Sequence, residues 1–160
     1  MDKLISCLDR QFAGLHGAHH ELIEAIPASL LYQQPPGSSS LFPVHSCGEY
    51  VLRAAAAVEQ TFGGLTSNLW DDPFEWTLPE TLTTPEKVAA YLDEVETTRR
   101  HGFEFFQSDR DLLKQIMAPS GETPLFSLLL DTLTRAAHYQ GGAKAMRDLL
   151  KTIPVNGKTS

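Results

Sequence analysis

Apolar residues in the first part of the chain recur at the spacing of a helix. They lie three, four or seven positions apart, at Leu4, Leu8, Phe12, Leu15, Leu22 and Ile26. This spacing places them on one side of a helix over residues 3–26. The next residues, 27–43, include four prolines, which remove backbone donors and disfavour helical backbone. The sequence predicts an ordered loop or a short linker there.

A second helix is predicted to begin after Ser46. The segment SCGE matches a capping box, in which the Ser46 side chain accepts from the third backbone amide and Glu49 reaches back. The helix continues through YVLRAAAAVEQTF and is predicted to end at Gly63-Gly64. Its run of alanines leaves room for a neighbouring helix at an interaxial distance of about 8 Å.

Aromatic residues and prolines mark a long connection after the second helix. Residues 66–83 lack helical periodicity and contain Trp70, Pro73, Phe74, Trp76 and Pro79. We expect these aromatic side chains to cover one end of the core. A third helix follows, because Thr84 is a good cap, Pro85 suits the first helical position and Glu86 suits the positive end of the dipole. It is predicted to persist to about Gln107.

The C-terminal part of the chain predicts a short helix and then a long one. The short helix is expected within SDRDLLKQIM, residues 108–117, before APSGETP interrupts the chain. The last helix starts near Thr123-Pro124. Its apolar stripe comprises Leu125, Leu128, Leu129, Thr132, Tyr139, Met146 and Leu149. Arg135 falls on the same stripe.

The predicted fold class is all-α, since no convincing strand or repeat is visible in the pattern. Four principal helices joined by long crossover loops are consistent with a four-helix bundle. The 160 residues fall within the usual range of one domain, so residues 1–160 are predicted to form one, with a flexible tail at 155–160.

Composition and charge exclude several classes of function. Hydrophobic residues make up 42% of the chain and charged residues 21%, as in ordinary globular proteins. The net charge of −7 argues against nucleic-acid binding, which needs clustered Lys and Arg. No apolar run reaches the roughly 18 residues of a membrane span, and no signal-peptide core is present. With neither a CxxC pair nor a disulfide framework, we expect a cytoplasmic protein.

Polar residues of the last helix are the first candidates for chemistry. Arg135 shares the apolar stripe, and Asp131, one turn earlier, can pair with it. Either the guanidinium belongs to a polar pocket for an anionic group, or it reaches solvent from the edge of the stripe. His138 can titrate near neutral pH, and Tyr139 can donate a hydrogen bond in a dry cavity. A structural role is the alternative for His138.

Histidines of the first helix are the second candidates. His16 and His20 are four residues apart, so both imidazoles lie on one helix face and can share one metal ion. Glu24 extends that face by another turn, and His19 lies beside it. A native site needs three or four convergent ligands, so a solvated polar face is the alternative.

Cys47 is a further candidate, because it lies in the first turn of the second helix. The helix dipole there would lower the pKa of the thiol and favour reactivity. The alternative is a small buried residue that serves packing alone, as free cysteines often do. The other cysteine, Cys7, belongs to the first helix.

Two helices of the chain resemble those of a known family. The segments FPVHSCGEYVLRAAAAVEQTFGGL and LLLDTLTRAAHYQGGAKAMRDLL look like the second and last helices of the DinB/YfiT-like superfamily. The resemblance covers nearly the full length and implies a four-helix bundle with an up-down-down-up arrangement, often dimeric. Many members bind a divalent metal through three histidines, and some relatives act as thiol-dependent transferases or hydrolases.

The resemblance also implies where a metal would bind, and this chain departs from the pattern there. The three ligand positions are occupied by Arg53, Arg135 and Tyr139, while His138 matches the family's adjacent histidine. Arginine stays protonated and has no acceptor, so two of the three residues repel a divalent cation. The site is therefore predicted to be degenerate and free of metal.

The leading hypothesis is small-molecule binding or a dimeric scaffold role. Arg53 and Arg135, bordered by Tyr139, could bind the carboxylate or phosphate of a small anionic ligand through charge-assisted hydrogen bonds. Asp131 or Glu49 would counter their charge, and in the alternative they neutralise both arginines in a structural network.

Two other functions stay open at this point. One is a metal-dependent thiol transferase or hydrolase, with a zinc or nickel site that includes His16 and His20, together with His45 or Glu24. The other is a structural or regulatory homodimer, in which apolar helix faces and the aromatic segment from Trp70 to Trp76 bury a partner surface.

Overall fold

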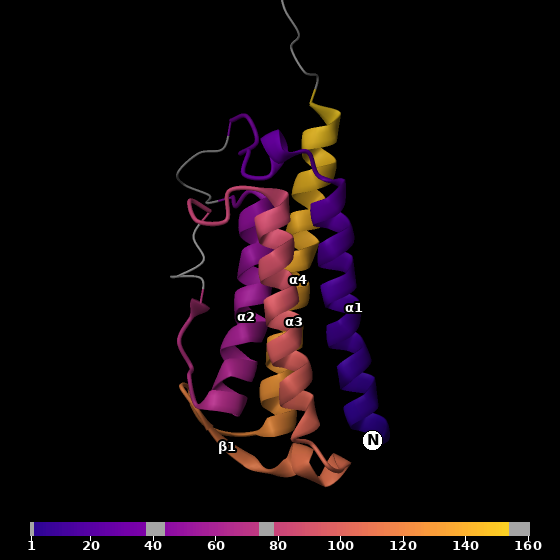
Figure 1. The fold of residues 1–160 in the computed structure, drawn as a ribbon, viewed down its shortest axis with the longest axis vertical. Helices are drawn as coiled ribbons and strands as arrows, with labels where there is room; N and C mark the ends of the chain where they lie inside the picture. The colour runs from indigo at the N-terminus through magenta and orange to yellow at the C-terminus, as the bar shows by residue number, and fades with distance from the viewer. Residues whose placement is uncertain (1, 38–43, 74–78, 154–160) are drawn as a thin grey trace, which may run out of the picture.

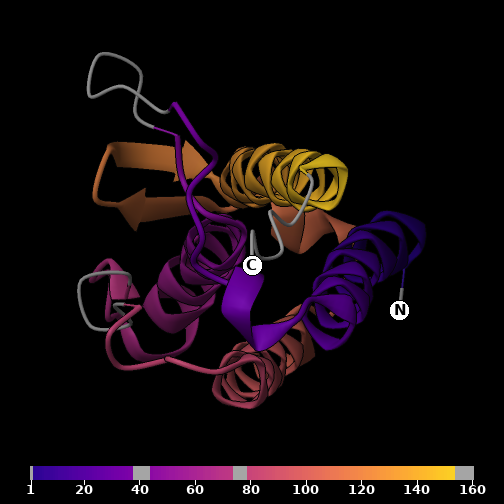
Figure 2. The ribbon, with the colours of Figure 1, turned by 90° about the horizontal axis from the view of Figure 1, so that it is seen from above.

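Four long α-helices lie side by side in the computed structural model, which describes residues 2–37, 44–73 and 79–153 (Figure 1). They are α1 (Lys3–Ala25), α2 (Cys47–Ser67), α3 (Pro85–Glu104) and α4 (Leu125–Thr152). Helices α1 and α4 run in one direction and α2 and α3 in the other (Figure 1). Seen from above, α1, α3, α2 and α4 follow one another around the assembly (Figure 2). The predicted, mainly helical architecture is confirmed.

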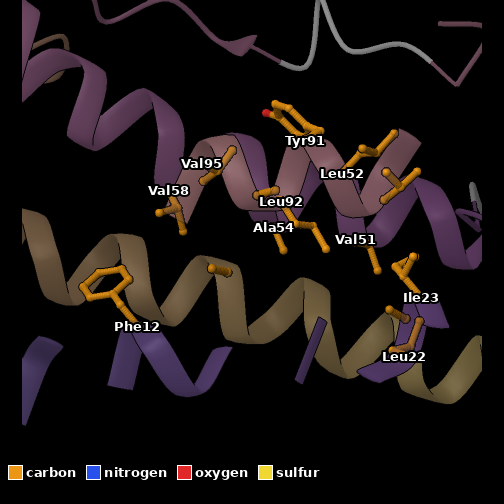
Figure 3. Packing of buried hydrophobic residues seen from close by; sticks show 14 of the residues in the cluster. Phe12, Leu22, Ile23, Val51, Leu52, Ala54, Val58, Tyr91, Leu92 and Val95 are labelled. Atoms are coloured by element: carbon orange, nitrogen blue, oxygen red, sulfur yellow. The ribbon is translucent and has the colours of Figure 1, made fainter. Parts of the chain in front are cut away.

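A continuous apolar core fills the space between the helices. The ring of Phe12 meets the rings of Phe62 and Phe103 edge to face, at 5.3 Å and 5.9 Å between ring centroids. Nearby, Val58 of α2 lies close to Val95 of α3 (Figure 3). Full burial of one such side chain contributes about 1.5–3 kcal/mol, so these contacts hold the helices together.

The predicted helix caps are present. The Ser46 hydroxyl accepts from the Glu49 amide at 3.2 Å, and the Glu49 carboxylate accepts from the Ser46 amide at 2.7 Å. The Thr84 hydroxyl accepts from the Lys87 amide at 3.3 Å, with Pro85 as the first helical residue. The first helix ends at Ala25, one residue before the predicted end.

The end of α2 differs from the prediction. The helix runs past Gly63-Gly64 to Ser67, where Asn68 adopts a left-handed conformation and ends it. Gly64 serves close packing instead, because a Cβ atom there would lie 2.2 Å from the Trp70 ring. The glycine pair is therefore a contact site for the following connection, which folds back on the helix.

Helix α3 also ends earlier than predicted, at Glu104 rather than near Gln107. The carboxylate of Asp111 accepts hydrogen bonds from the backbone amides of Gln107 at 2.7 Å and Ser108 at 2.9 Å. These bonds begin a separate short 3-10 helix, η3 (Asp109–Leu113). A new cap thus replaces the last predicted turn of α3.

A short hairpin precedes α4 and contradicts the prediction that the chain has no strand. Strand β1 (Gln115–Ala118) pairs antiparallel with β2 (Gly121–Pro124), with Ala118 opposite Gly121. The second half of the short helix predicted over 108–117 is therefore wrong. Strands of four residues are too short for an alternating pattern to stand out from the neighbouring turn.

The buried helix faces are shifted slightly from the predicted stripes. Leu4 is 53% exposed and Leu149 is 46% exposed, whereas their neighbours Ile5 and Leu150 are buried. Arg135 is exposed, so the buried stripe of α4 passes beside it. None of the helices in the described part of the chain is long and apolar enough to cross a membrane.

The connections between helices are tied to each other at one end of the molecule. A short 3-10 helix, η1 (Ala28–Leu30), follows α1, and the nearby Tyr32 hydroxyl donates to the carbonyl of Leu82, just before α3. Helix α2 ends at the end of the molecule opposite the one where α3 begins (Figure 1). The predicted roles of Phe74, Trp76 and the tail at 155–160 lie outside the described residues.

A buried arginine joins α1 to α3 and is not foreseen by the sequence analysis. The Arg99 side chain is 3% exposed and donates to Asp9 of α1 and, at 2.7 and 2.8 Å, to Glu96. Burial lowers the pKa of Arg99, but the hydrogen bonds and charges of Glu96 and Asp9 outweigh it and raise this pKa above its usual value. Arg99 therefore stays charged inside the helical assembly.

We expect Gly102→Ala to destabilise the fold, because a Cβ atom there would lie 2.5 Å from the fully buried Phe62 ring. Overpacking of this kind costs about 1–3 kcal/mol of unfolding free energy, measurable by urea denaturation. Gly14→Ala in α1 is the control, since its Cβ atom meets nothing within 4 Å. It should gain up to about 1 kcal/mol from helix propensity. Equal stability of the two variants would contradict the packing argument.

Arg99→Ala is expected to lower the unfolding free energy by about 3 kcal/mol, because it strands the carboxylates of Asp9 and Glu96. The neighbouring Arg100→Ala is the matched control, since Arg100 is exposed. It should change stability by no more than about 0.5 kcal/mol. Urea denaturation of both variants measures the difference, and a loss below about 1 kcal/mol for Arg99→Ala would argue against a buried ion-pair role.

Candidate functional site

A small cavity between α2 and α4 brings together the three residues at the ligand positions implied by the resemblance. Arg53 and Gln60 of α2 line it, with Arg135 and Tyr139 of α4 and Asp72 of the connection after α2. Its volume of about 50 Å³ suits a few waters or one small ionic group. Arg135 Nη2 donates to Gln60 Oε1 at 3.4 Å. Two guanidinium groups and one carboxylate give this cavity a net positive charge.

A larger groove of about 390 Å³ continues from the small cavity. Gln60 and Arg135 line both hollows, and Trp70 and Leu128 add apolar surface to the groove. At the groove, the hydroxyls of Thr61 and Thr132 hydrogen-bond across α2 and α4 at 2.7 Å. Arg135 therefore stands between a small charged cavity and a wider, more apolar surface.

The three other residues predicted for this site lie in different environments. Asp131 is exposed and lines the groove, but Arg135 donates to Gln60 rather than to Asp131. The Glu49 carboxylate accepts from the Ser46 amide and hydroxyl at 2.7 and 2.9 Å, so it belongs to the cap of α2. His138 is exposed, and its ring packs against Tyr139 with 5.7 Å between centroids.

The donor set of the α2–α4 cavity does not fit a divalent metal ion. A guanidinium has no lone pair to offer and stays protonated, so Arg53 and Arg135 repel a cation. Tyr139 alone supplies an oxygen ligand from the three positions. The chemistry of these side chains instead suits an anion, which can accept hydrogen bonds from both guanidinium groups and from the phenol.

A second polar cluster lies between α1 and α3, and it includes the predicted pair His16 and His20. Asp93 of α3 joins them, so that one potential ligand atom from each residue lies within 4.8 Å of the others. His20 Nε2 lies 2.8 Å from Asp93 Oδ1, and His16 Nε2 lies 3.6 Å from the same oxygen. Burial lowers the pKa of His16, with smaller opposing effects from nearby charges such as Glu96.

The remaining residues of the predicted histidine site lie in different places. Glu24 Oε1 lies 3.8 Å from Nδ1 of His20, on the side of the ring away from Asp93. His45 instead packs its ring against Tyr50 at 5.2 Å between centroids. His19 is 3% exposed, and burial lowers its pKa to about 4, so it is neutral at physiological pH.

Asp93 and Asp72 complete the two clusters, and neither is predicted from the sequence. Asp93 is one of several acidic residues on the exposed side of α3, and it meets His20 across 73 positions of the chain. Asp72 lies in a connection without periodicity. Their residue types are compatible with a site, but no local spacing marks either one as part of it.

Cys47 is a buried packing residue, as one of the two interpretations of the sequence predicts, and not a reactive thiol. The side chain is fully buried in the first turn of α2. Burial raises the pKa of the Cys47 thiol to about 12, and the charge of Arg147 opposes this shift only in part. The thiolate would have to form inside the core. The effect of burial on the pKa of the thiol therefore outweighs the effect of the helix dipole.

Searches of protein-family models, curated proteins and solved structures found no significant match to this chain. The resemblance to the DinB/YfiT-like superfamily therefore stays a prediction from the residues of α2 and α4. A function has to be inferred from the geometry and charge of the two clusters themselves.

Iodoacetamide at pH 8 should alkylate Cys7 and leave Cys47 unmodified in the folded protein. Cys7 is exposed, whereas Cys47 is buried and its thiol is protonated at this pH. Peptide mass spectrometry measures the two rates separately, and unfolding in urea should make them similar. Equal rates in the folded protein would show that Cys47 is open to solvent.

Proposed function

We propose that the chain is a DinB-like four-helix bundle whose α2–α4 cavity binds the anionic group of a small molecule. The convergence of Arg53, Arg135 and Tyr139 on one cavity is the observation that carries this proposal. The directions of the four helices agree with the up-down-down-up arrangement of such bundles, which supports the family assignment (Figure 1). The dimeric and scaffold roles stay predictions.

Charge and hydrogen bonding favour a carboxylate or a phosphate in this cavity. A planar guanidinium presents its donors as a fork that matches two oxygens of either group. Each hydrogen bond to a charged partner contributes about 1.5–3 kcal/mol. Asp72 also lines the cavity and opposes an anion, but two guanidinium groups outnumber its single carboxylate.

The larger groove supports a ligand that has an uncharged body beside its anionic group. It adjoins the small cavity at Arg135, so a ligand whose carboxylate meets this guanidinium can extend along Leu128 and Trp70. The cavity of about 50 Å³ is too small for more than the charged group itself. We therefore favour an amphipathic carboxylate over a compact polyanion.

Octanoate should bind to the protein, and 1-octanol, which has the same chain length without the charge, should bind at least roughly tenfold more weakly. Arg53→Gln and Arg135→Gln should each weaken octanoate binding by roughly tenfold, because each removes a charged donor from the cavity. Isothermal titration calorimetry measures these affinities directly.

Arg147→Gln is the matched control, since Arg147 also belongs to α4 but pairs with Asp148 at 2.9 Å and does not line the cavity. It should leave octanoate binding unchanged. Equal affinity of the wild-type protein and the Arg53→Gln, Arg135→Gln double variant would contradict the proposal. Stoichiometric zinc that is lost on Tyr139→Phe would contradict it as well.

A further inference from the structure

We propose that the surface between α1 and α3 binds one divalent transition-metal ion through His16, His20 and Asp93. The ligand atoms of these three side chains lie within 4.8 Å of one another. The neighbouring helices α1 and α3, which carry these residues, lie opposite the pair α2 and α4 (Figure 2). It therefore goes beyond the proposed anion binding and does not depend on it.

The two distances from the imidazoles to Asp93 lie on either side of the separation in a tetrahedral site, and the two imidazole nitrogens, within 4.8 Å of each other, have to move no more than about 1.4 Å closer. Ligands with bonds of about 2.0–2.1 Å lie about 3.4 Å apart around such an ion. The 3.6 Å between His16 Nε2 and Asp93 Oδ1 already matches this separation. The 2.8 Å hydrogen bond from His20 Nε2 to the same oxygen has to open by roughly 0.5 Å, and an exposed aspartate can make this adjustment.

The helix geometry explains why the two imidazoles share the site. His16 and His20 are one turn apart on α1, and their ring centroids are 4.8 Å apart. Asp93 approaches from α3, so the third ligand comes from a second, separately packed helix. An ion held in this way would bridge α1 and α3, which a pair of histidines on one surface helix cannot do.

Glu24 supplies the outer partner that a metal-bound histidine usually has. Its carboxylate lies 3.8 Å from His20 Nδ1, the nitrogen that faces away from Asp93. A carboxylate in this position accepts the Nδ1 proton, which leaves Nε2 free to bind the metal and fixes the orientation of the ring. The contact needs only a small shortening to become a hydrogen bond.

The ligand types select the class of ion. Two imidazoles and one carboxylate suit zinc, cobalt or nickel, whereas magnesium and calcium prefer oxygen ligands alone. Three protein ligands leave one position of a tetrahedral ion for water. Both histidines are half-buried and Asp93 is exposed, so an ion can enter from solvent and keep a water ligand there.

Zinc titration of the tag-free protein, after treatment with a chelator, tests the site. We expect one zinc ion per chain by calorimetry and a rise in melting temperature, because an ion that binds only the folded state stabilises it. Magnesium should give neither effect. The His16→Ala, His20→Ala double variant should lose both effects, and Asp93→Asn should weaken zinc binding at least roughly tenfold.

His101→Ala is the matched control, because His101 also lies 3.3 Å from a carboxylate, that of Glu104, on the exposed part of α3. Its zinc affinity should equal that of the wild-type protein. Cobalt binding gives a second measurement, since the visible spectrum of the ion reports its ligands. The visible spectrum of bound cobalt should be altered by Asp93→Asn and unchanged by His101→Ala.

Two results would overturn the proposal. Unchanged zinc affinity in the His16→Ala, His20→Ala variant would place the ion elsewhere. Unchanged affinity in Asp93→Asn would reduce the site to a surface pair of histidines. Asn at position 93 keeps the size of the side chain and can still accept from His20, so this variant decides the question even if the double variant fails to fold.

Discussion

The close packing of α2 against α3 and α4 is the constraint on which the rest of the structure depends. The alanines at 54–57 are all buried, and their small side chains let the neighbouring helices approach. A helix enclosed in this way can keep polar side chains only where they reach a crevice. Arg53 and Gln60 therefore line the α2–α4 cavity, and Glu59 accepts from the Tyr91 hydroxyl of α3. An uncompensated charge in the core would lower the free energy of unfolding by several kcal/mol.

The α2–α4 cavity and the α1–α3 cluster have opposite chemical character. Arginines from both helices line the α2–α4 cavity, whereas imidazoles and carboxylates lie at the surface between α1 and α3. Deeper between α1 and α3, Arg99 is already neutralised by Asp9 and Glu96 and repels a cation at His16 only weakly. The proposed anion and the proposed metal ion would thus bind between different pairs of helices.

Interactions between residues close in sequence can be predicted, and interactions between helices mostly cannot. The caps at Ser46 and Thr84 are predictable because a cap joins residues three positions apart. The hairpin before α4 is not, because four-residue strands carry no clear period. The resemblance points to Arg53, Arg135 and Tyr139 as one site, and their common cavity agrees with it. The histidine pair is visible from its spacing, but only the packing of α1 on α3 brings Asp93 to it.

The core between the two crevices prevents the proposed sites from acting as one catalytic centre. Buried side chains of the core, among them Phe12, Val58 and Leu92, fill the space between the helices (Figure 3). A metal ion at Asp93 would therefore not contact an anion at Arg135. The anion binding proposed for the α2–α4 cavity and the metal binding proposed for the α1–α3 cluster are therefore independent of each other.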